Sequence, residues 1–131
     1  MEVRCWLATP TVFVTRATGH LDEASIRFYA EHAERTLESG GKLLVFHDWL
    51  AVTGYKPQAR AWLAVWIGRW NAQLEATHVL LHSPQVLMAA TVTAMTFRRA
   101  IYTYVNEAPF LEALRGAIDA SSGSPPPAAG G

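Results

Sequence analysis

The chain has little cysteine and no excess of either charge, and each shortage excludes a class of protein. Its one cysteine, Cys5, cannot form an internal disulfide, so we expect a reducing, cytoplasmic compartment rather than a disulfide-stapled secreted domain. Eleven basic and eleven acidic residues give a formal net charge of +0, which argues against a broad charged surface for nucleic acid or anionic lipid. No apolar run approaches about 18 residues, and no basic N-terminal segment leads into an apolar stretch. We therefore expect neither a membrane span nor a signal peptide.

Motifs that carry catalytic chemistry are also missing. There is no glycine-rich phosphate loop, because Gly40 and Gly41 are typical of a helix end. Cys5 falls in a predicted strand without a context that activates a thiol. Ser83 precedes Pro84 and is explained as a helix cap. The sequence therefore predicts no catalytic residue, no cofactor and no enzyme activity.

What is present predicts one folded domain. Half of the 131 residues are apolar and five are tryptophan, which is enough for a substantial core. Strands are expected near 3–8, 11–17, 42–47, 78–82 and 101–105, and helices near 22–38, 57–74, 83–95 and 106–118. This order predicts an α/β fold in residues 1–120, with a mixed five-stranded sheet and about four helices. Residues 121–131, rich in Ser, Gly and Pro, are expected to be a disordered tail.

Two apolar runs predict the centre of the sheet. The segment 42–47 contains four consecutive apolar residues and 78–82 contains three, without the alternation of a half-exposed strand. The residues that we expect to be buried in central strands are Leu44, Val45, Phe46, Leu80 and Leu81.

Several segments carry a family resemblance. They are "GHLDEASIRFY" entering a helix, the apolar strand ending at Asp48, "SPQVLMA" after the fourth strand and the closing "FLEAL" helix. Together with the order of elements, they resemble the STAS domain, the sulfate-transporter and anti-sigma-factor-antagonist family, and within it the SpoIIAA-like branch. The resemblance covers about residues 3–118 and implies a regulatory domain that binds another protein.

One departure from that family concerns its phosphorylated serine. Antagonists of this family carry an Asp-Ser or Ser-Ser pair at the start of the helix after the third strand, where a kinase modifies the serine. The matching positions here are Lys56, Pro57 and Gln58, and none accepts a phosphate. Thr53 and Tyr55 supply the nearby hydroxyls, but both precede the positions that match the phosphorylated serine. The resemblance therefore implies the fold of the antagonists without their phosphorylation switch.

The segment 48–58 is the predicted docking site. The third strand is expected to end at Asp48, so a loop would lie at the edge where open α/β sheets place their sites. Asp48 itself is interpreted mainly as a loop cap that accepts backbone N–H bonds. Trp49 and Tyr55 are the expected exposed anchors, because loop aromatics have no face that requires burial. The residues of the predicted partner-binding surface are Asp48, Trp49, Thr53, Tyr55, Lys56, Gln58 and Arg60.

Two histidines raise the question of a metal. His47 and His82 fall at the ends of predicted parallel strands, and with Asp48 they form a set that suits a transition metal. The three ligands come from separate elements, however, with no short spacing that would enforce their geometry. We therefore predict no metal site.

The helix that begins at Pro57 carries an unusual number of tryptophans. Trp62, Trp66 and Trp70 recur every four residues and are interpreted mainly as core. The alternative is that one or two project outward and form a partner or self-association surface, with Arg60 and Arg69 at its rim.

Two functions remain open. The first is a non-catalytic regulatory module that binds an unidentified protein or forms a homodimer. The second is binding of a small apolar, lipid-like ligand, because SpoIIAA-like domains resemble lipid-binding relatives in fold. An apolar cavity between the tryptophan helix and the helix that starts at Ser83 would favour the ligand. A solid core with an exposed aromatic patch would favour the protein partner.

Overall fold

The structure, a computed structural model, describes residues 2–121. Its elements are, in chain order, β1 (Glu2–Thr9), β2 (Val12–Leu21), α1 (Glu23–Glu38), β3 (Leu43–Tyr55), α2 (Pro57–Trp70), the 3₁₀ turn η1 (Asn71–Gln73), β4 (Leu74–Leu81), α3 (Pro84–Phe97), β5 (Ile101–Tyr104) and α4 (Glu107–Ser121). None of the helices in this range is long and apolar enough to cross a membrane.

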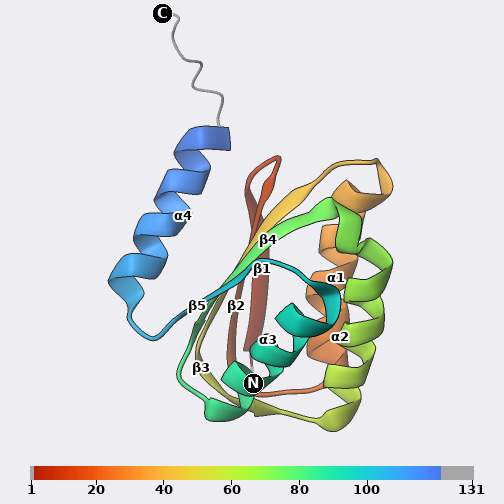
Figure 1. Cartoon of the computed structure of the whole chain (residues 1–131), viewed down its shortest axis with the longest axis vertical. Coiled ribbons are helices and arrows are strands. Elements are labelled where there is room, and N and C mark those ends of the chain that lie inside the picture. The colour runs from red at the N-terminus through yellow and green to blue at the C-terminus, as the bar shows by residue number, and fades with distance from the viewer. Residues whose placement is uncertain (1, 122–131) are drawn as a thin grey trace, which may run out of the picture.

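The five strands form one mixed sheet in the order β1-β2-β3-β4-β5 (Figure 1). β1 runs antiparallel to β2, and the pairs β2–β3, β3–β4 and β4–β5 are parallel. Parallel neighbours need a crossover, and a helix supplies each one. The predicted α/β fold with a mixed five-stranded sheet is therefore confirmed.

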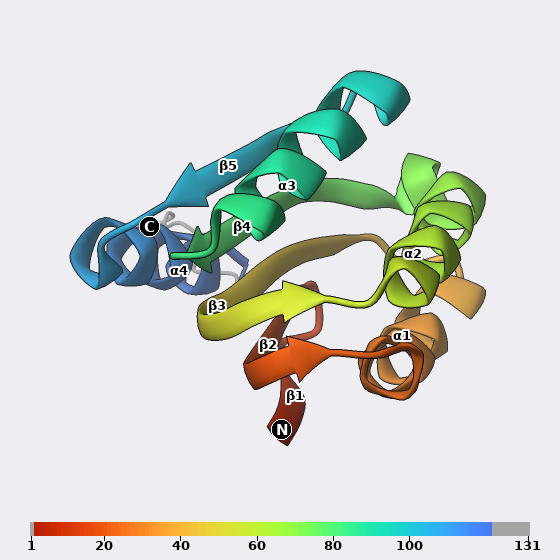
Figure 2. The same ribbon diagram turned by 90° about the horizontal axis from the view of Figure 1, so that it is seen from below.

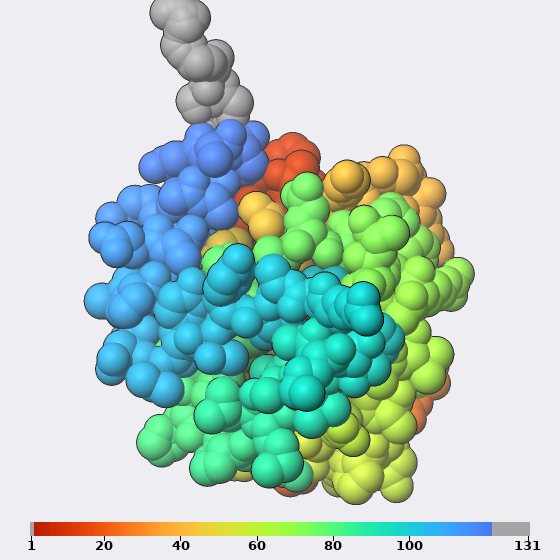
Figure 3. Space-filling view, viewed as in Figure 1, coloured from red at the N-terminus to blue at the C-terminus, as the bar shows by residue number. Residues whose placement is uncertain are grey.

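The helices cover the two faces of the sheet unequally (Figure 2). α1, α2 and α3 lie on one face, and α4 lies on the other. The first face carries the larger core, and the second a smaller one built around Phe46 and Phe110, whose rings meet edge-on with centroids 5.9 Å apart. In the space-filling view α3 and α2 lie side by side at the surface (Figure 3). The site described below lies beneath these two helices.

Local capping explains where two helices begin. The carboxylate of Asp22 accepts the backbone N–H of Ser25 at 2.9 Å, and the hydroxyl of Ser83 accepts that of Val86 at 3.3 Å. Each bond satisfies one of the N–H groups that a helix start leaves unpaired. Both helix starts agree with the sequence prediction.

The prediction that the third strand ends at Asp48 is wrong. β3 continues to Tyr55, because it pairs with β2 from Val12↔Leu44 to Leu21↔Tyr55. The register shifts between Arg16 and Thr18, which marks a bulge. Pairing to a distant strand overrides the local end signal, so most of the predicted 48–58 loop is strand.

Other helices and strands also begin or end at residues that differ from the sequence prediction. α2 ends at Trp70, and Leu74, predicted to lie on that helix, begins β4 because it pairs with Leu43. The second strand, expected near 11–17, extends to Leu21 and includes Gly19 at a φ of 85° beside a register shift. α4 reaches Ser121, the first residue of the predicted tail. The remainder of that tail, 122–131, lies outside the described residues.

Four of the five predicted core residues are buried: Val45, Phe46, Leu80 and Leu81. Leu44 is half-buried and packs on the smaller core against α4. Its partial exposure follows from that side of the sheet having a single helix to cover it.

Candidate functional site

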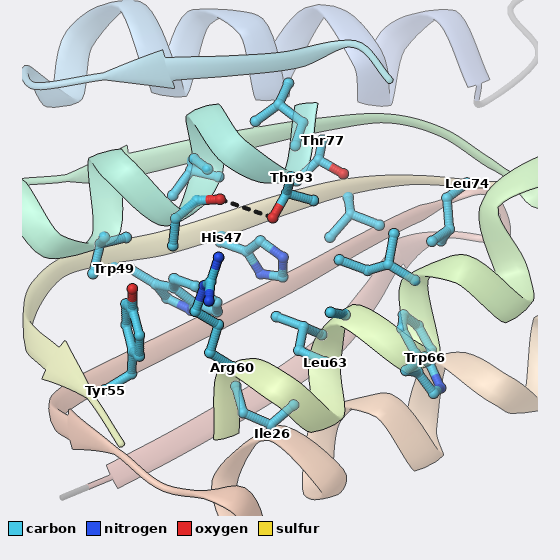
Figure 4. Close-up of a pocket in the computed structure, with 18 of the residues that line it drawn as sticks. Ile26, His47, Trp49, Tyr55, Arg60, Leu63, Trp66, Leu74, Thr77 and Thr93 are labelled. Atoms are coloured by element: carbon cyan, nitrogen blue, oxygen red, sulfur yellow. Dashed lines mark hydrogen bonds between the residues drawn. The ribbon is translucent and has the colours of Figure 1, made fainter. Parts of the chain in front are cut away.

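A cavity of 180 Å³ lies between the sheet and the layer formed by α1, α2 and α3. Figure 4 shows His47 and Trp49 of β3 facing Arg60 and Leu63 of α2, with Thr93 of α3 closing the space from another side. Its walls come from β2, β3, β4 and β5 as well as from the three helices. The cavity is therefore built by tertiary packing and belongs to no single segment.

Small side chains beneath the two covering helices explain why the space is open. α2 presents Ala59 and Ala64 to the cavity, and α3 presents Ala89 and Ala90. The only buried residue of α3 is Val86. The methyl groups of these alanines leave volume between the helices and the sheet unfilled, whereas ordinary protein interiors are packed to crystal-like density.

Most of the cavity wall is hydrocarbon. Aliphatic and aromatic side chains of the sheet and helices supply it, among them Phe13, Ile26, Val45, Leu63, Trp66, Ile67, Val79, Val92 and Ile101. Apolar cavities with a few convergent polar groups are typical of small-molecule sites.

His47 is the first of these polar groups. Its Nδ1 lies 2.7 Å from the hydroxyl of Thr15, which also accepts the indole N–H of Trp49 at 3.1 Å. The rings of His47 and Trp49 stack with centroids 4.3 Å apart. Burial, together with the nearby positive charge of Arg99, lowers the pKa of His47 to about 3. The imidazole is therefore neutral at physiological pH.

Tyr29 contributes a hydroxyl that lacks a partner. Its ring packs against His47 and Trp49, with centroids 5.4 Å and 6.1 Å away. The hydroxyl is buried, and no hydrogen-bond acceptor or donor within residues 2–121 reaches it. Burial raises the pKa of the phenol above its ordinary value. An unpaired buried hydroxyl is uncommon and costs free energy, so it marks a place where a ligand or water can bind.

Two arginines, Arg60 and Arg99, line the cavity. Arg99 is buried, with 9% of its surface exposed. Its Nη1 donates to Asn71 Oδ1 at 2.8 Å and to the carbonyl of Leu74 at 3.0 Å, and its Nη2 donates to Thr77 Oγ1 at 3.0 Å. All three acceptors are neutral. Burial lowers the pKa of the guanidinium, which nevertheless starts from so high a value that it stays charged.

Two solved structures share this arrangement of elements. One is an uncharacterized protein of the DUF3478 family with a SpoIIAA-like fold from Shewanella loihica PV-4, at a TM-score of 0.64 and 13% identity, covering 86% of this chain and 93% of that one. The other is the anti-sigma factor antagonist SpoIIAA in its unphosphorylated form, at a TM-score of 0.63 and 14% identity, covering 88% of this chain and 99% of that one. The fold is SpoIIAA-like. At these identities the similarity concerns the fold alone.

Comparisons of sequence add nothing to the structural matches. No model of a protein family matches the chain, and no curated protein matches it either. The SpoIIAA-like fold is therefore established by architecture, while the residues of the cavity have to be interpreted on their own chemistry.

The SpoIIAA-like sheet separates the residues that the sequence analysis had grouped. Successive residues of a strand point to opposite faces. His47 consequently faces the cavity, whereas Asp48 lies on the face of α4 and pairs with Arg16, its Oδ2 3.0 Å from Nε. His82 is exposed after the end of β4. Within the described residues, no three His, Cys, Asp or Glu side chains group as a metal site.

The predicted docking surface is also divided. Trp49 was expected to be an exposed anchor, and that is wrong: it is 7% exposed because it lies on a central strand facing the helices. Tyr55 is half-buried at the end of β3, where its backbone N–H meets Gln85 Oε1 at 3.3 Å. The four other members past the bulge are exposed, namely Thr53, Lys56, Gln58 and Arg60.

The tryptophans of α2 lie mainly in the core. Trp66 is buried and donates its indole N–H to Glu34 of α1 at 2.8 Å. Trp62 and Trp70 are half-buried, and each is covered by an arginine 5.0 Å from its ring centre, Arg27 and Arg69 respectively. The interpretation of the stripe as core is therefore confirmed for Trp66 and in part for the other two.

Sequence reasoning missed the polar residues that matter most in the cavity. Tyr29 lies on the buried face of α1, and nothing in the local sequence marks its hydroxyl as unpaired. Arg99 follows Arg98 directly in the sequence, and an adjacent pair of arginines is typical of a solvent-exposed position. Its burial depends on contacts with Asn71 and Thr77 from distant segments, so no local signal could have found it.

Proposed function

We propose that this protein is a non-catalytic binding protein that holds a small apolar molecule in the cavity beneath α2 and α3. The observation that carries the proposal is the cavity itself. Native interiors contain few voids larger than a water molecule. An engineered apolar cavity of about 150 Å³ in another protein binds benzene, and the 180 Å³ here leaves room for one aromatic ring or a short alkyl chain.

The chemistry of the wall supports binding without catalysis. The described residues that line the cavity include no Asp, Glu, Ser or Cys. His47 therefore has no carboxylate among these lining residues that would orient it as a general base. Its depressed pKa, about 3, also places it far from the range useful for proton transfer at neutral pH.

Thermal unfolding with a neutral probe tests the proposal. A ligand that binds only the folded state stabilises it by about 2.7 kcal/mol at 100 times its Kd. Toluene should therefore raise the melting temperature, and it should also change the fluorescence of Trp49 and Trp66, which line the cavity. If toluene and short alkanes leave both signals unchanged at saturation, the cavity does not take up apolar molecules.

A pair of variants on α3 locates the binding. Ala90 faces the cavity, so Ala90→Phe should fill it and abolish the stabilisation by toluene. Thr91, the next residue, is exposed, and Thr91→Phe should leave the stabilisation intact. Equal effects of the two substitutions would place the probe elsewhere.

Protein binding is a second candidate function, favoured by an exposed apolar stripe on α3. Met88 and Met95 are 69% and 76% exposed and lie seven residues apart, on one side of the helix, with Val92 between them. Exposed methionines are common at adaptable protein-binding surfaces. This stripe, with the exposed start of α2, replaces the predicted 48–58 loop as the surface for a partner or a homodimer. Light scattering should show a loss of self-association in Met88→Lys/Met95→Lys if the surface forms a homodimer.

A further inference from the structure

The guanidinium of Arg99 is a buried positive charge without a negative partner. It is 91% removed from solvent, given its 9% exposure, and its three hydrogen bonds go to an amide, a backbone carbonyl and a hydroxyl. Within residues 2–121 no carboxylate lies within ion-pair distance of it. Because buried charges are normally paired, Arg99 lacks the counterion that its burial requires.

The guanidinium of Arg99 also has N–H groups that form no hydrogen bond in the described part of the chain. Its bonds use both protons of Nη1 and one of Nη2, so Nε–H and the other Nη2 proton remain without a partner in the described part of the chain. A carboxylate is an acceptor that pairs with two such N–H groups at once.

The surroundings of Arg99 suit an anion. The only charged residues among those lining the cavity within residues 2–121 are Arg60 and Arg99. The phenol of Tyr29, a further donor on the same wall, is unpaired. Hydrogen bonding of His47 to Thr15 uses Nδ1 and leaves Nε2 without a partner in this range. An entering anion therefore meets donors and positive charge, with no carboxylate to repel it.

We propose that the cavity binds a small amphiphilic monocarboxylate, with one aromatic ring or a short alkyl chain, whose carboxylate pairs with Arg99. This rests on the proposed function and names its ligand class. A hydrocarbon alone would leave Arg99 unpaired, and a small inorganic anion would leave the apolar wall empty. The cavity volume of 180 Å³ limits the apolar part to about one ring, by comparison with benzene in about 150 Å³.

Arg60 is the competing position for the carboxylate. It lines the cavity from the first turn of α2, but it is exposed, so water and salt screen its charge. Arg99 acts in a low-dielectric interior, where the same charge attracts an anion more strongly. The structure therefore favours Arg99 for the ion pair, and the comparison of the two arginines is part of the test.

A matched pair of ligands separates charge from shape. Calorimetric titration of the full chain with 3-phenylpropanoate and with 3-phenylpropanamide measures two affinities for nearly the same shape. We expect the carboxylate to bind at least about tenfold tighter than the amide, as one charge-assisted contact implies. In Arg99→Gln this ratio should fall to near one, with the amide affinity nearly unchanged.

Two control variants carry the same change in charge. Arg98→Gln alters the exposed neighbour, and Arg60→Gln alters the exposed arginine of the wall. Arg98→Gln should keep the wild-type ratio of the carboxylate affinity to the amide affinity, and Arg60→Gln should lower this ratio much less than Arg99→Gln does. A ratio lost in Arg60→Gln and kept in Arg99→Gln would place the anion at α2 and overturn the proposal.

The remaining outcomes are also decisive. If Arg99 only braces Asn71 and Leu74, Arg99→Gln will weaken both ligands equally, which overturns the ion pair. Equal affinities in the wild type overturn the carboxylate proposal and leave the proposed function standing, whereas failure of toluene and both phenyl ligands overturns both. If Arg99→Gln does not fold, the ratio of carboxylate to amide affinity is measured for the wild type from pH 7 to pH 4. The proposal requires this ratio to fall, because the carboxyl group of the ligand is protonated and loses its charge. A constant ratio refutes the proposal.

Discussion

Lowering the pH from 7 to 5 is expected to destabilise the protein by about 2 kcal/mol through His47 alone. The folded-state pKa of His47 is about 3, because the imidazole is buried and lies near Arg99. In the unfolded chain the same group has a pKa of about 6.5. Between these values the unfolded state binds a proton that the folded state does not, so the free energy of unfolding rises with pH.

The size of the effect follows from the gap between the two pKa values. The stability that His47 contributes is fully present above about pH 6.5 and is lost at about 1.4 kcal/mol per pH unit as the pH falls toward 3. At pH 5 the gap of about 1.5 units corresponds to about 2 kcal/mol. This is a considerable part of the 5–15 kcal/mol that stabilises a typical domain.

The assay is urea unfolding at several pH values between 5 and 8, followed by tryptophan fluorescence. His47→Asn is the reference variant, because its amide oxygen can still accept a hydrogen bond from Thr15 while the group no longer titrates. The difference between wild type and variant removes the contributions of other groups, including His78, whose pKa is also lowered by burial. As the pH falls, the free energy of unfolding should decrease more steeply for the wild type than for His47→Asn. Parallel curves from pH 7 to pH 5 would refute a buried neutral His47.

Three further predictions concern packing and charge. Phe46 is fully buried between His78 and Phe110, so Phe46→Ala should cost about 3–5 kcal/mol in urea unfolding, and a cost below about 1 kcal/mol would contradict its central position. Trp49→Ala removes a buried indole and its bond to Thr15, and should likewise lower the free energy of unfolding by about 3 kcal/mol or more; a neutral effect would restore the exposed anchor that the sequence had suggested. Asp48→Asn removes the charge from an ion pair whose Arg16 side chain is 53% exposed. The free energy of unfolding, measured by thermal unfolding, should therefore fall by less than about 1 kcal/mol, and a larger loss would show that the pair is more than a surface contact.

The sequence by itself determined the order of the elements and the identity of the central strands. Continuous apolar runs around Phe46 and Leu80 can be accommodated only where both faces of a strand are covered. The caps at Asp22 and Ser83 act within four residues of the helix that they start, so their signal is local. Alternation of strand and helix then restricted the architecture to a largely parallel sheet.

Tertiary structure alone decided the length of β3 and the side of the sheet on which its polar residues lie. Pairing with β2 carried the strand past Asp48, and the two-residue period placed His47 and Asp48 on opposite faces. A local pattern cannot specify such pairing, since the partner residues lie about 30 positions away.

The candidate site also arose only in the folded chain. A cavity is the difference between the space that helices and sheet enclose and the volume of the side chains that fill it, so it depends on alanines of two helices and on strands far apart in sequence. Arg99 became a buried charge because Asn71, Leu74 and Thr77 surround it, and nothing in its own neighbourhood of the sequence announces that burial. Local propensities determine which elements form, whereas the distances between them determine what they can bind.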